Sequence, residues 1–366
     1  MSVAQTHKKE PLLRIVKRIE LDSRNAMLLK LASIVGAIVA GGLFILAIGF
    51  NPFAVYATIL NGAFRSAEAV RATVKLAIPL LISALGVSLA FKMRFWNIGA
   101  EGQIIMGAVF ATYFALYHSA WPKPLLMLVM FLASLVGGAF WGLIPAFCKA
   151  RFGTNETLFT LMLNYIALSI IVFLRDGPWA DPESSGFPKI ARFAKNAQLY
   201  QVFKVQIGWI IALILVVLVY IYLNYTKQGY EISVVGESSA TAKYAGMPVR
   251  AIILRTMAVS GAVCGIAGMT QAAGSDMTLA ASVAGGVGFT AIIVAWLASL
   301  NPFGILITTI LFSVLEKGCS VMQSTFGLSA YSAGVLQGII LFFVLAGEFF
   351  IRYRFVMRKR GGASHG

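Results

Sequence analysis

Ten apolar stretches, most of them long enough to cross a lipid bilayer, dominate this sequence. A transmembrane helix needs about 20 consecutive apolar residues, with a range of about 17 to 25. Hydrophobic residues make up 59% of the chain and charged residues only 12%, whereas a soluble domain carries about 25% charged residues. The composition therefore predicts an all-α, polytopic integral membrane protein with about ten transmembrane helices. We expect these helices at 31–50, 74–91, 98–117, 124–147, 155–174, 207–224, 251–274, 283–300, 302–316 and 331–350.

The segment 51–73 is apolar only in part, because it contains Arg65, Glu68 and Arg71. We expect it to lie at the membrane interface or to re-enter the membrane. Cytoplasmic loops retain Lys and Arg, and most of the chain's 30 Lys and Arg residues fall inside if both termini are cytoplasmic. The predicted parts are a basic amphipathic N-terminal segment (1–30), a transmembrane domain (31–350) with an outer loop (175–206) and a cytoplasmic loop (225–250), and a basic cytoplasmic tail (351–366).

Within residues 12–21 apolar positions recur at helical spacing opposite basic ones, which predicts a helix lying on the membrane surface. A disordered basic tail is the alternative. The formal net charge of +16 is explained by membrane orientation and by contact with anionic membrane lipids, so it requires no nucleic-acid partner.

The sequence lacks the motifs of self-contained chemistry. It has no G-x-x-x-x-G-K-[ST] phosphate loop for ATP, and no H-E-x-x-H motif or intramembrane Ser with a His partner that would indicate a protease. Cys148, Cys264 and Cys319 form no C-x-x-C pair, so we expect neither a disulfide nor a metal site. Paired carboxylates suitable for a proton relay are also missing from the spans. We therefore predict a non-enzymatic path through the membrane, without catalytic residues, metal or cofactor, whose energy comes from elsewhere.

Polar residues at the start of the third expected span form a first candidate site. Asn97 suits a helix N-cap, and Glu101 in the first turn would sit favourably against the positive helix end. Irregular backbone at membrane depth must face protein or water. Together with Gln103, these residues therefore either cap a helix without touching a solute or line a translocation path.

The fifth expected span carries a second polar group. Thr157, Thr160 and Asn164 fall on one helical face, at spacings of three and four residues. Asn164 lies near the middle of the span, where an unpaired amide costs several kcal/mol. Its side chain must therefore bond either to a neighbouring helix or to a solute in the path, and the sequence leaves both open.

The loop after the sixth expected span is rich in small residues, which allow a short helix to pack closely against a partner. Ala242 and Gly246 lie four residues apart, so we expect them to share the contact face, with Ser239 roughly opposite. Pro248 ends the helix. An ordinary interfacial connector is the alternative. The candidate contact residues are Gly236, Glu237, Ala240, Ala242, Tyr244, Ala245 and Gly246.

Four motifs, in order along the chain, resemble the permease subunits of bacterial ABC importers. They are Asn97-Ile98-Gly99-Ala100-Glu101-Gly102-Gln103, Thr160-Leu161-Met162-Leu163-Asn164-Tyr165-Ile166-Ala167, Arg175-Asp176-Gly177-Pro178-Trp179 with Gly186-Phe187-Pro188, and Val235-Gly236-Glu237 through Tyr244-Ala245-Gly246. The resemblance covers about residues 50 to 350 and lies in the ribose, branched-chain amino acid and nucleoside branch, closest to nucleoside or simple-sugar uptake permeases. One departure is that Ser238 and Ser239 follow Glu237, where the family pattern has Asn and often Pro.

The resemblance implies a multi-pass subunit of the bacterial cell (inner) membrane that carries a small polar solute, a nucleoside first and a simple sugar next. It implies a complex with a second, related permease chain, with cytosolic ABC ATPase subunits that bind the ATP, and with an extracellular solute-binding lipoprotein. In that arrangement the loop 236–246 is the helix that couples to the ATPase, and the segments 97–103 and 160–164 border the solute path. The outer-loop residues that would receive the binding protein are Arg175, Lys189, Arg192 and Lys195.

Two other classes of function remain open from the sequence. A self-sufficient secondary transporter or channel would need no cytosolic partner. A membrane enzyme of lipid metabolism would need clustered carboxylates or a His at the interface, and only Asp181 and Glu183 lie near one another, in the outer loop.

Overall fold

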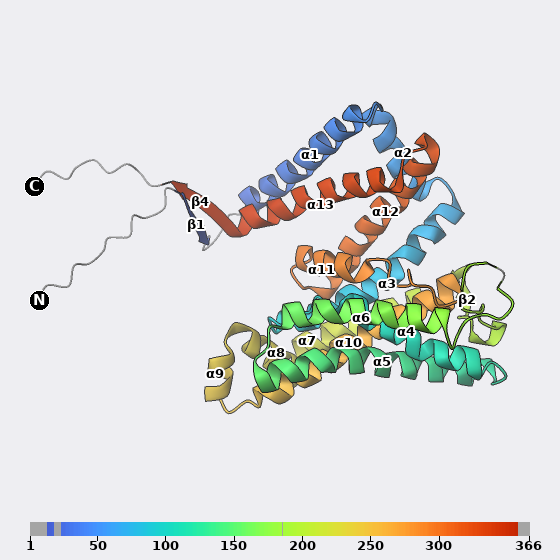
Figure 1. Ribbon diagram of the computed structural model, residues 1–366. Helices are drawn as coiled ribbons and strands as arrows, with labels where there is room; N and C mark the ends of the chain where they lie inside the picture. The colour runs from blue at the N-terminus through green and yellow to red at the C-terminus, as the bar shows by residue number, and fades with distance from the viewer. Residues whose placement is uncertain (1–12, 18–22, 185, 358–366) are drawn as a thin grey trace, which may run out of the picture. The chain divides into compact units, whose positions relative to one another are not determined.

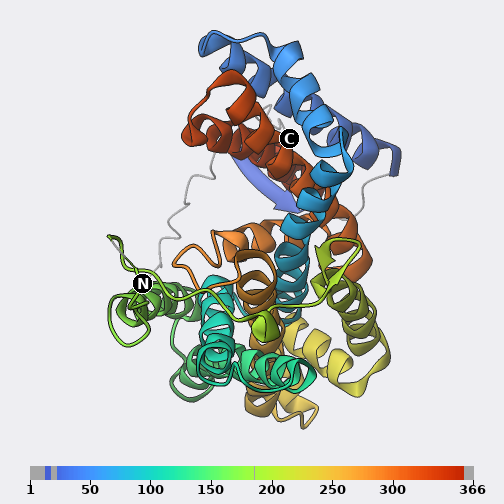
Figure 2. The ribbon, with the colours of Figure 1, turned by 90° about the vertical axis from the view of Figure 1, so that its right-hand side faces the viewer.

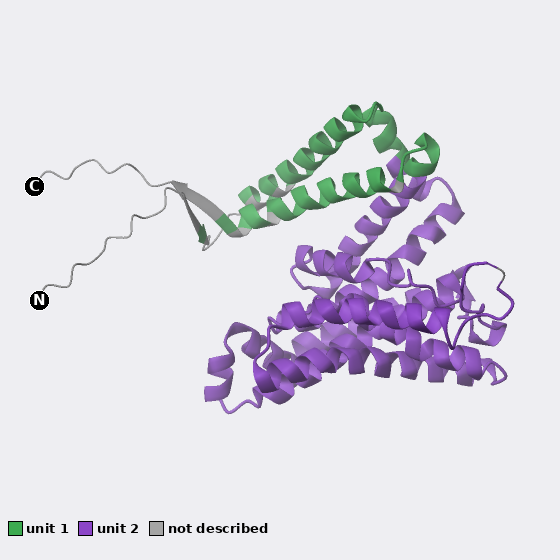
Figure 3. Cartoon of the chain, in the orientation of Figure 1, with its two compact units in different colours: residues 1–58, 322–366 green, residues 59–321 purple. Residues whose placement is uncertain are grey.

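The computed structural model describes residues 13–17, 23–184 and 186–357, and the chain divides into two compact units (Figure 3). Unit 1 combines residues 1–58 with residues 322–366, and unit 2 comprises residues 59–321. Helices make up most of the described part, as the composition predicts, and the few strands are short.

Unit 1 is built on two long apolar helices that pack side by side, α1 (Ser23–Ala47) and α13 (Ala330–Arg352). The hydroxyl of Tyr56 donates a hydrogen bond to the Ile38 carbonyl at 2.7 Å, which ties the chain after α1 back onto that helix. A Cβ atom on Gly41 would meet the Tyr56 hydroxyl, so this position of α1 has no room for a side chain.

Residues 13–17 form a strand, β1 (Leu13–Lys17), where the sequence predicted a surface helix. This strand pairs antiparallel with β4 (Tyr353–Met357) over five residues. Ile15 and Val16 are β-branched and favour the extended chain when a partner strand is at hand. The partner lies more than 300 residues away in sequence, so the local periodicity could not indicate it. The other residues of the expected helix lie outside the described residues.

Unit 2 contains the remaining elements, most of which Figure 1 labels. The helices shared between the units are α2 (Pro52–Phe64) and α12 (Pro302–Phe326). The other helices are α3 (Ala67–Lys92), α4 (Ala100–Tyr117), α5 (Lys123–Phe152), α6 (Glu156–Asp176), α7 (Gly208–Tyr225), α8 (Lys227–Glu237), α9 (Ser239–Tyr244), α10 (Val249–Thr270) and α11 (Val287–Leu297). The short elements are the 3₁₀ turn η1 (Lys195–Ala197), the hairpin β2 (Gln201–Val202) and β3 (Val205–Gln206), and the π-helix η2 (Gln271–Asp276) that continues α10.

Helix α10 occupies the centre of unit 2, where it packs against α3, α4 and α5 (Figures 1 and 2). Small residues allow this arrangement. A Cβ atom on Gly138 would meet the carbonyl oxygen of Gly261, and a Cβ atom on Gly261 would meet that of Gly138. The backbones of α5 and α10 therefore touch directly, as in close helix packing within membranes.

Eight helices in the described part are long and apolar enough to cross a membrane. They cover eight of the ten expected spans. The third expected span (98–117) is the 18-residue α4, whose first turn carries Glu101 and Gln103 and lowers its hydropathy. The eighth (283–300) contains only the 11-residue α11, which is about 16 Å long and too short to span the bilayer.

Two further boundaries differ from the prediction. The expected segment 51–73 contains α2 and, from Ala67 on, the first turns of α3, because Ser66 caps α3 by accepting from the Ala69 amide at 3.1 Å. Glu68 in the first turn suits the positive helix end. The ninth span is longer than expected, since α12 continues to Phe326.

The helices of unit 2 alternate in direction, so its loops gather at two ends. The outer loop and the β2–β3 hairpin lie at one end, and α8 and α9 lie at the opposite end (Figure 1). At the α9 end, a buried apolar cluster joins Met93, Ala146, Val235 and Val249. At the other end, the Asn196 amide donates to the carbonyls of Ser119 and Trp121, both at 3.3 Å.

Candidate functional site

The connection between α3 and α4 is held by a buried amide pair. The side-chain amides of Asn97 and Gln103 each donate to the other, both at 3.2 Å, and both residues are almost fully buried. Asn97 also accepts from the Gly99 amide at 3.1 Å. Gly99, and not Asn97 as predicted, occupies the N-cap position of α4.

Asn164 of α6 joins this connection from the neighbouring helix. Its side-chain nitrogen donates to the Ile98 carbonyl and its oxygen accepts from the Gly102 amide, both at 2.9 Å. The Thr160 hydroxyl accepts from the Ile98 amide at 3.2 Å and donates to the Glu156 carbonyl at 2.7 Å. Gly102 lies in the first turn of α4, whose amides have no partner within the helix. The sequence left open whether Asn164 bonds to a neighbouring helix or to a solute. In the structure its side chain bonds to the first turn of α4 and to the chain just before that helix.

Glu101 reaches a different element, the start of α11. One carboxylate oxygen accepts from the Gly286 amide at 2.7 Å and the other from the Gly288 amide at 2.8 Å. A carboxylate at a helix N-terminus is favourable, so Glu101 in the first turn of α4 also caps a second helix. Gly286 has φ +85°, and a Cβ atom on Gly288 would meet the backbone of Glu101. Both positions therefore require glycine.

The sixth candidate path residue, Thr157, lies at the start of α6 and is half-buried. Its amide donates at 3.0 Å to the side-chain oxygen of Asn155, the residue that caps the helix. Its carbonyl accepts from the Thr160 hydroxyl at 3.1 Å. The structure thus brings four candidates together, Asn97, Gln103, Thr160 and Asn164, and directs Glu101 towards α11. Sequence reasoning missed the role of Gly286 and Gly288, although the glycine-rich start of the eighth expected span was the available signal.

The candidate coupling loop forms two helices, α8 and α9, separated at Ser238, whose hydroxyl accepts from the Thr241 amide at 3.2 Å. Ala242 is fully buried in the cluster at this end of unit 2. Gly246 lies beyond the helix with φ +74° and is exposed. These two residues therefore do not share an outward face, contrary to the sequence prediction.

The remaining coupling candidates divide between two environments. Gly236 is buried, and a Cβ atom there would meet the Lys92 carbonyl oxygen, so α8 lies directly on the end of α3. Tyr244 is 94% exposed and follows Ala240 by one helical turn. The exposed candidates are Glu237, Ala240, Tyr244, Ala245 and Gly246.

The outer loop is fastened to the chain that follows α10. The Leu199 amide donates to the Ala273 carbonyl at 3.0 Å, and the Phe193 amide to the Met277 carbonyl at 2.8 Å. The Thr278 hydroxyl donates to the Ile190 carbonyl at 2.9 Å. Much of this long loop is therefore a strap over the π-helix η2 and the residues after it.

Three of the four basic docking candidates line one pocket of about 640 Å³ in this strap, together with Asp276 and Thr278. Arg175 bonds to Asp176 at 2.6 and 3.1 Å, and the Lys189 ammonium lies 3.9 Å from Asp181. Arg192 donates to the sulfur of Met277 at 3.0 Å. The fourth, Lys195, begins η1 and is exposed.

Within the described residues, no three His, Cys, Asp or Glu side chains are placed to hold a metal ion. The described part of the chain is a helical domain with eight helices long and apolar enough to cross a membrane, which defines it as a multi-pass membrane protein. The family described as "Branched-chain amino acid transport system / permease component" matches residues 70–345, and the chain belongs to this family.

Several curated proteins are similar to it over most of their length. The glucose ABC transporter permease protein TsgB13 of Haloferax volcanii is 31% identical, with 88% of each chain covered. The guanosine ABC transporter permease protein NupP of Bacillus subtilis is 31% identical over 92% of this chain and 98% of its own. The nucleoside ABC transporter permease protein NupB of Lactococcus lactis is 31% identical over 87% of this chain and 90% of its own.

Family membership confirms the resemblance on which the sequence analysis rested. The chain is a multi-pass membrane protein of the ABC transporter permease class, a transport subunit and not an enzyme.

Proposed function

We propose that this chain is the permease of an importer for a nucleoside, which an extracellular binding lipoprotein delivers and cytosolic ATPase subunits drive. The observation that carries this proposal is the similarity to two relatives named for guanosine and nucleoside transport, each 31% identical over most of both chains. A simple sugar is the second candidate solute, because the Haloferax volcanii relative of equal identity is named for glucose.

The partner in the membrane would be a second, related permease. Bacillus subtilis contains two guanosine permease proteins that match this chain, NupP at 31% and NupQ at 26% identity. This pair supports a heteromeric arrangement for the present chain. We further propose that the α9 end of unit 2 and both termini face the cytosol, which the distribution of Lys and Arg favours.

The ATPase would contact the exposed side of α9 and the residues around it. Tyr244 is almost fully exposed and Ala240 lies one turn before it, so the two would form the centre of the contact. Ala242 and Gly236 face inward and transmit the movement of this short helix to the core of the permease. Glu237, Ala245 and Gly246 complete the contact.

The solute path would run beside the α3–α4 connection and the start of α11. Irregular backbone is tolerated at membrane depth only where protein or water covers it, and the chain between η2 and α11 is irregular. Asn97, Gln103, Thr160 and Asn164 would hold the wall of this path, while Glu101 and Thr157 remain partly exposed. The outer loop, with Arg175, Lys189, Arg192 and Lys195, would receive the binding protein.

Reconstitution into proteoliposomes tests the function. We expect the complex of this chain, its second permease, the ATPase and the binding protein to take up labelled guanosine when ATP is present on the side of the membrane that the ATPase subunits face. Unlabelled nucleosides should compete with this uptake, and glucose should not. Competition by glucose alone would replace the nucleoside with a sugar. Uptake without ATPase subunits, or nucleotide hydrolysis by the pure chain, would contradict the importer and support a self-sufficient transporter or an enzyme.

A further inference from the structure

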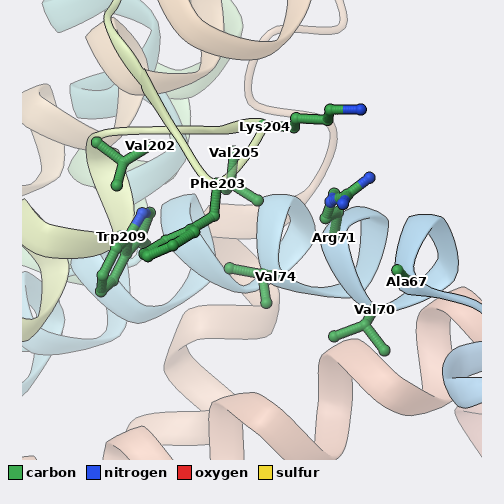
Figure 4. A pocket seen from close by; sticks show the side chains of 9 residues that line it. All are labelled: Ala67, Val70, Arg71, Val74, Val202, Phe203, Lys204, Val205 and Trp209. Atoms are coloured by element: carbon green, nitrogen blue, oxygen red, sulfur yellow. The ribbon is translucent and has the colours of Figure 1, made fainter.

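A groove of about 700 Å³ lies in unit 2 between the first turns of α3 and α7 and the β2–β3 hairpin (Figure 4). Val70, Val74 and Trp209 contribute apolar lining, and Arg71 and Lys204 contribute charge. Figure 4 shows the charged ends of Arg71 and Lys204 pointing the same way, away from Trp209. The groove is therefore apolar along most of its length and cationic at one rim.

Neither cation is in an ion pair within the part of the chain that the structure describes, although Glu68 lies three residues before Arg71. Of the described residues that line the groove, none is acidic. This rim is therefore complementary to an anion.

The hairpin turn that supplies Lys204 has an unusual backbone. Val202 pairs with Val205, so Phe203 and Lys204 form a two-residue turn, with φ values of +56° and +63°. Turns of this kind favour Asn and Gly, and a bulky residue at positive φ is an outlier. The turn places Phe203, which is 81% exposed, over the groove and Lys204 at its rim.

An apolar track continues from the groove along α7. Trp209, Leu213 and Val217 follow one another at four-residue spacing, so they share a face over about 12 Å. Leu213 is 42% and Val217 48% exposed, and both line a shallow apolar hollow. The environment therefore changes from cationic to aromatic to aliphatic along the groove and α7. A phospholipid changes in the corresponding order, from its charged headgroup to its acyl chains.

We propose that this groove binds an anionic phospholipid. Arg71 and Lys204 hold the headgroup phosphate, Phe203 and Trp209 lie at the level of the glycerol backbone, and an acyl chain follows Leu213 and Val217 of α7. The site needs both the charged rim and the apolar track. A free phosphate ion would use only the rim, and a neutral lipid only the track.

Native mass spectrometry of the assembled transporter tests this site. The complex in mild detergent is titrated with phosphatidylglycerol or with phosphatidylcholine of the same acyl chains. We expect selective retention of phosphatidylglycerol, weakened about fivefold by Arg71→Ala or Lys204→Ala alone and about 25-fold by both together, since each cation near a membrane surface contributes about that factor. Phosphatidylcholine, whose phosphate charge is offset by its choline group, should bind more weakly in the parent, and its binding should change less in these variants.

Two matched variants separate a lost site from a damaged fold. Arg65→Ala removes a nearby exposed cation outside the groove and should leave phosphatidylglycerol binding unchanged. Arg71→Lys with Lys204→Arg keeps both charges and should retain it. Equal retention by the parent and the double alanine variant would overturn the proposal. Displacement of the lipid by millimolar inorganic phosphate would make the groove a simple anion site. Loss of binding-protein or second-permease association in the double variant, with phosphatidylglycerol still retained, would assign the groove to a protein partner.

Discussion

At the scale of single residues, polar side chains in this membrane domain connect helices that are far apart in sequence. Asn164 completes the first turn of α4 from α6, and Glu101 completes the first turn of α11 from α4. Lipid offers no partner for such backbone groups. Each side chain therefore replaces the solvent that would otherwise satisfy a helix end.

Glu101→Gln tests the cap on α11. The amide has one acceptor oxygen instead of two, and its NH₂ group would face the Gly286 or Gly288 amide, so one charge-assisted bond is lost and the other becomes neutral. We expect a loss of about 1 to 3 kcal/mol in local stability and a reduced rate of uptake. The measurement is the apparent melting temperature of the complex together with solute uptake. Glu68→Gln, at an exposed position in α3, is the control, and equal behaviour of the two variants would show that the cap has no role.

Asn164→Leu tests whether Asn164 holds helices together or contacts the solute. Leucine has a similar size but leaves the Ile98 carbonyl and the Gly102 amide without partners, which costs about 2 to 5 kcal/mol. We expect poor assembly and a lower melting temperature, measured by size-exclusion chromatography after heating. Thr157→Val should assemble normally, because the bonds at Thr157 described above use its backbone. A well-assembled Asn164→Leu complex without uptake would return Asn164 to the solute path.

The polar residues that matter could be recognised in the sequence, because a polar side chain in an apolar stretch needs a reason. Their partners could not, since the bonds of Asn164 join residues 62 and 66 positions apart. Whether such an amide meets a helix or a solute depends on which spans become neighbours, and hydropathy carries no information on that.

At the scale of elements, the short helices differ most from the sequence prediction. Hydropathy predicts two continuous spans, at 251–274 and 283–300, whereas the structure has a π-helix at the end of the first and a helix of only 11 residues within the second. Long apolar helices such as α5 and α6 begin and end within a few residues of the prediction. Length and hydrophobicity are local properties, while a helix break depends on caps from other elements, as Glu101 provides here.

The two faces of α9 give a prediction with its own control. Ala242→Arg would bury a charge in the cluster at this end of unit 2, where Ala242 is fully enclosed, and we expect misassembly. Ala240→Arg and Tyr244→Ala change exposed positions, so these variants should assemble but lose the stimulation of ATP hydrolysis by loaded binding protein. ATPase assays on purified complexes measure this. Normal coupling in both exposed variants would make α9 an ordinary connector.

At the scale of the whole molecule, unit 2 presents different chemistry at its two ends. One end carries the exposed helix α9 above a buried apolar cluster, and the other carries a loop strapped onto η2. Helix α10 runs between them and, through η2, bears the strap. Coupling between two sites is reciprocal, so a central helix that contacts the core at one end and the strap at the other is suited to link events at both membrane surfaces.

The strap also predicts how the binding protein engages. Arg192 contacts the sulfur of Met277 just after η2, and Lys195 is exposed on η1, so both charges lie where a docking partner could act on the end of α10. Arg192→Glu with Lys195→Glu should weaken stimulation of ATP hydrolysis by loaded binding protein several-fold at low salt. The difference should shrink towards 1 M salt, where the Debye length falls to about 3 Å. Lys227→Glu, an exposed position at the opposite end of unit 2, controls for net charge and should not change the salt dependence. If the double variant responds to binding protein like the parent at low salt, docking occurs elsewhere, and the strap serves only to hold η2 in place.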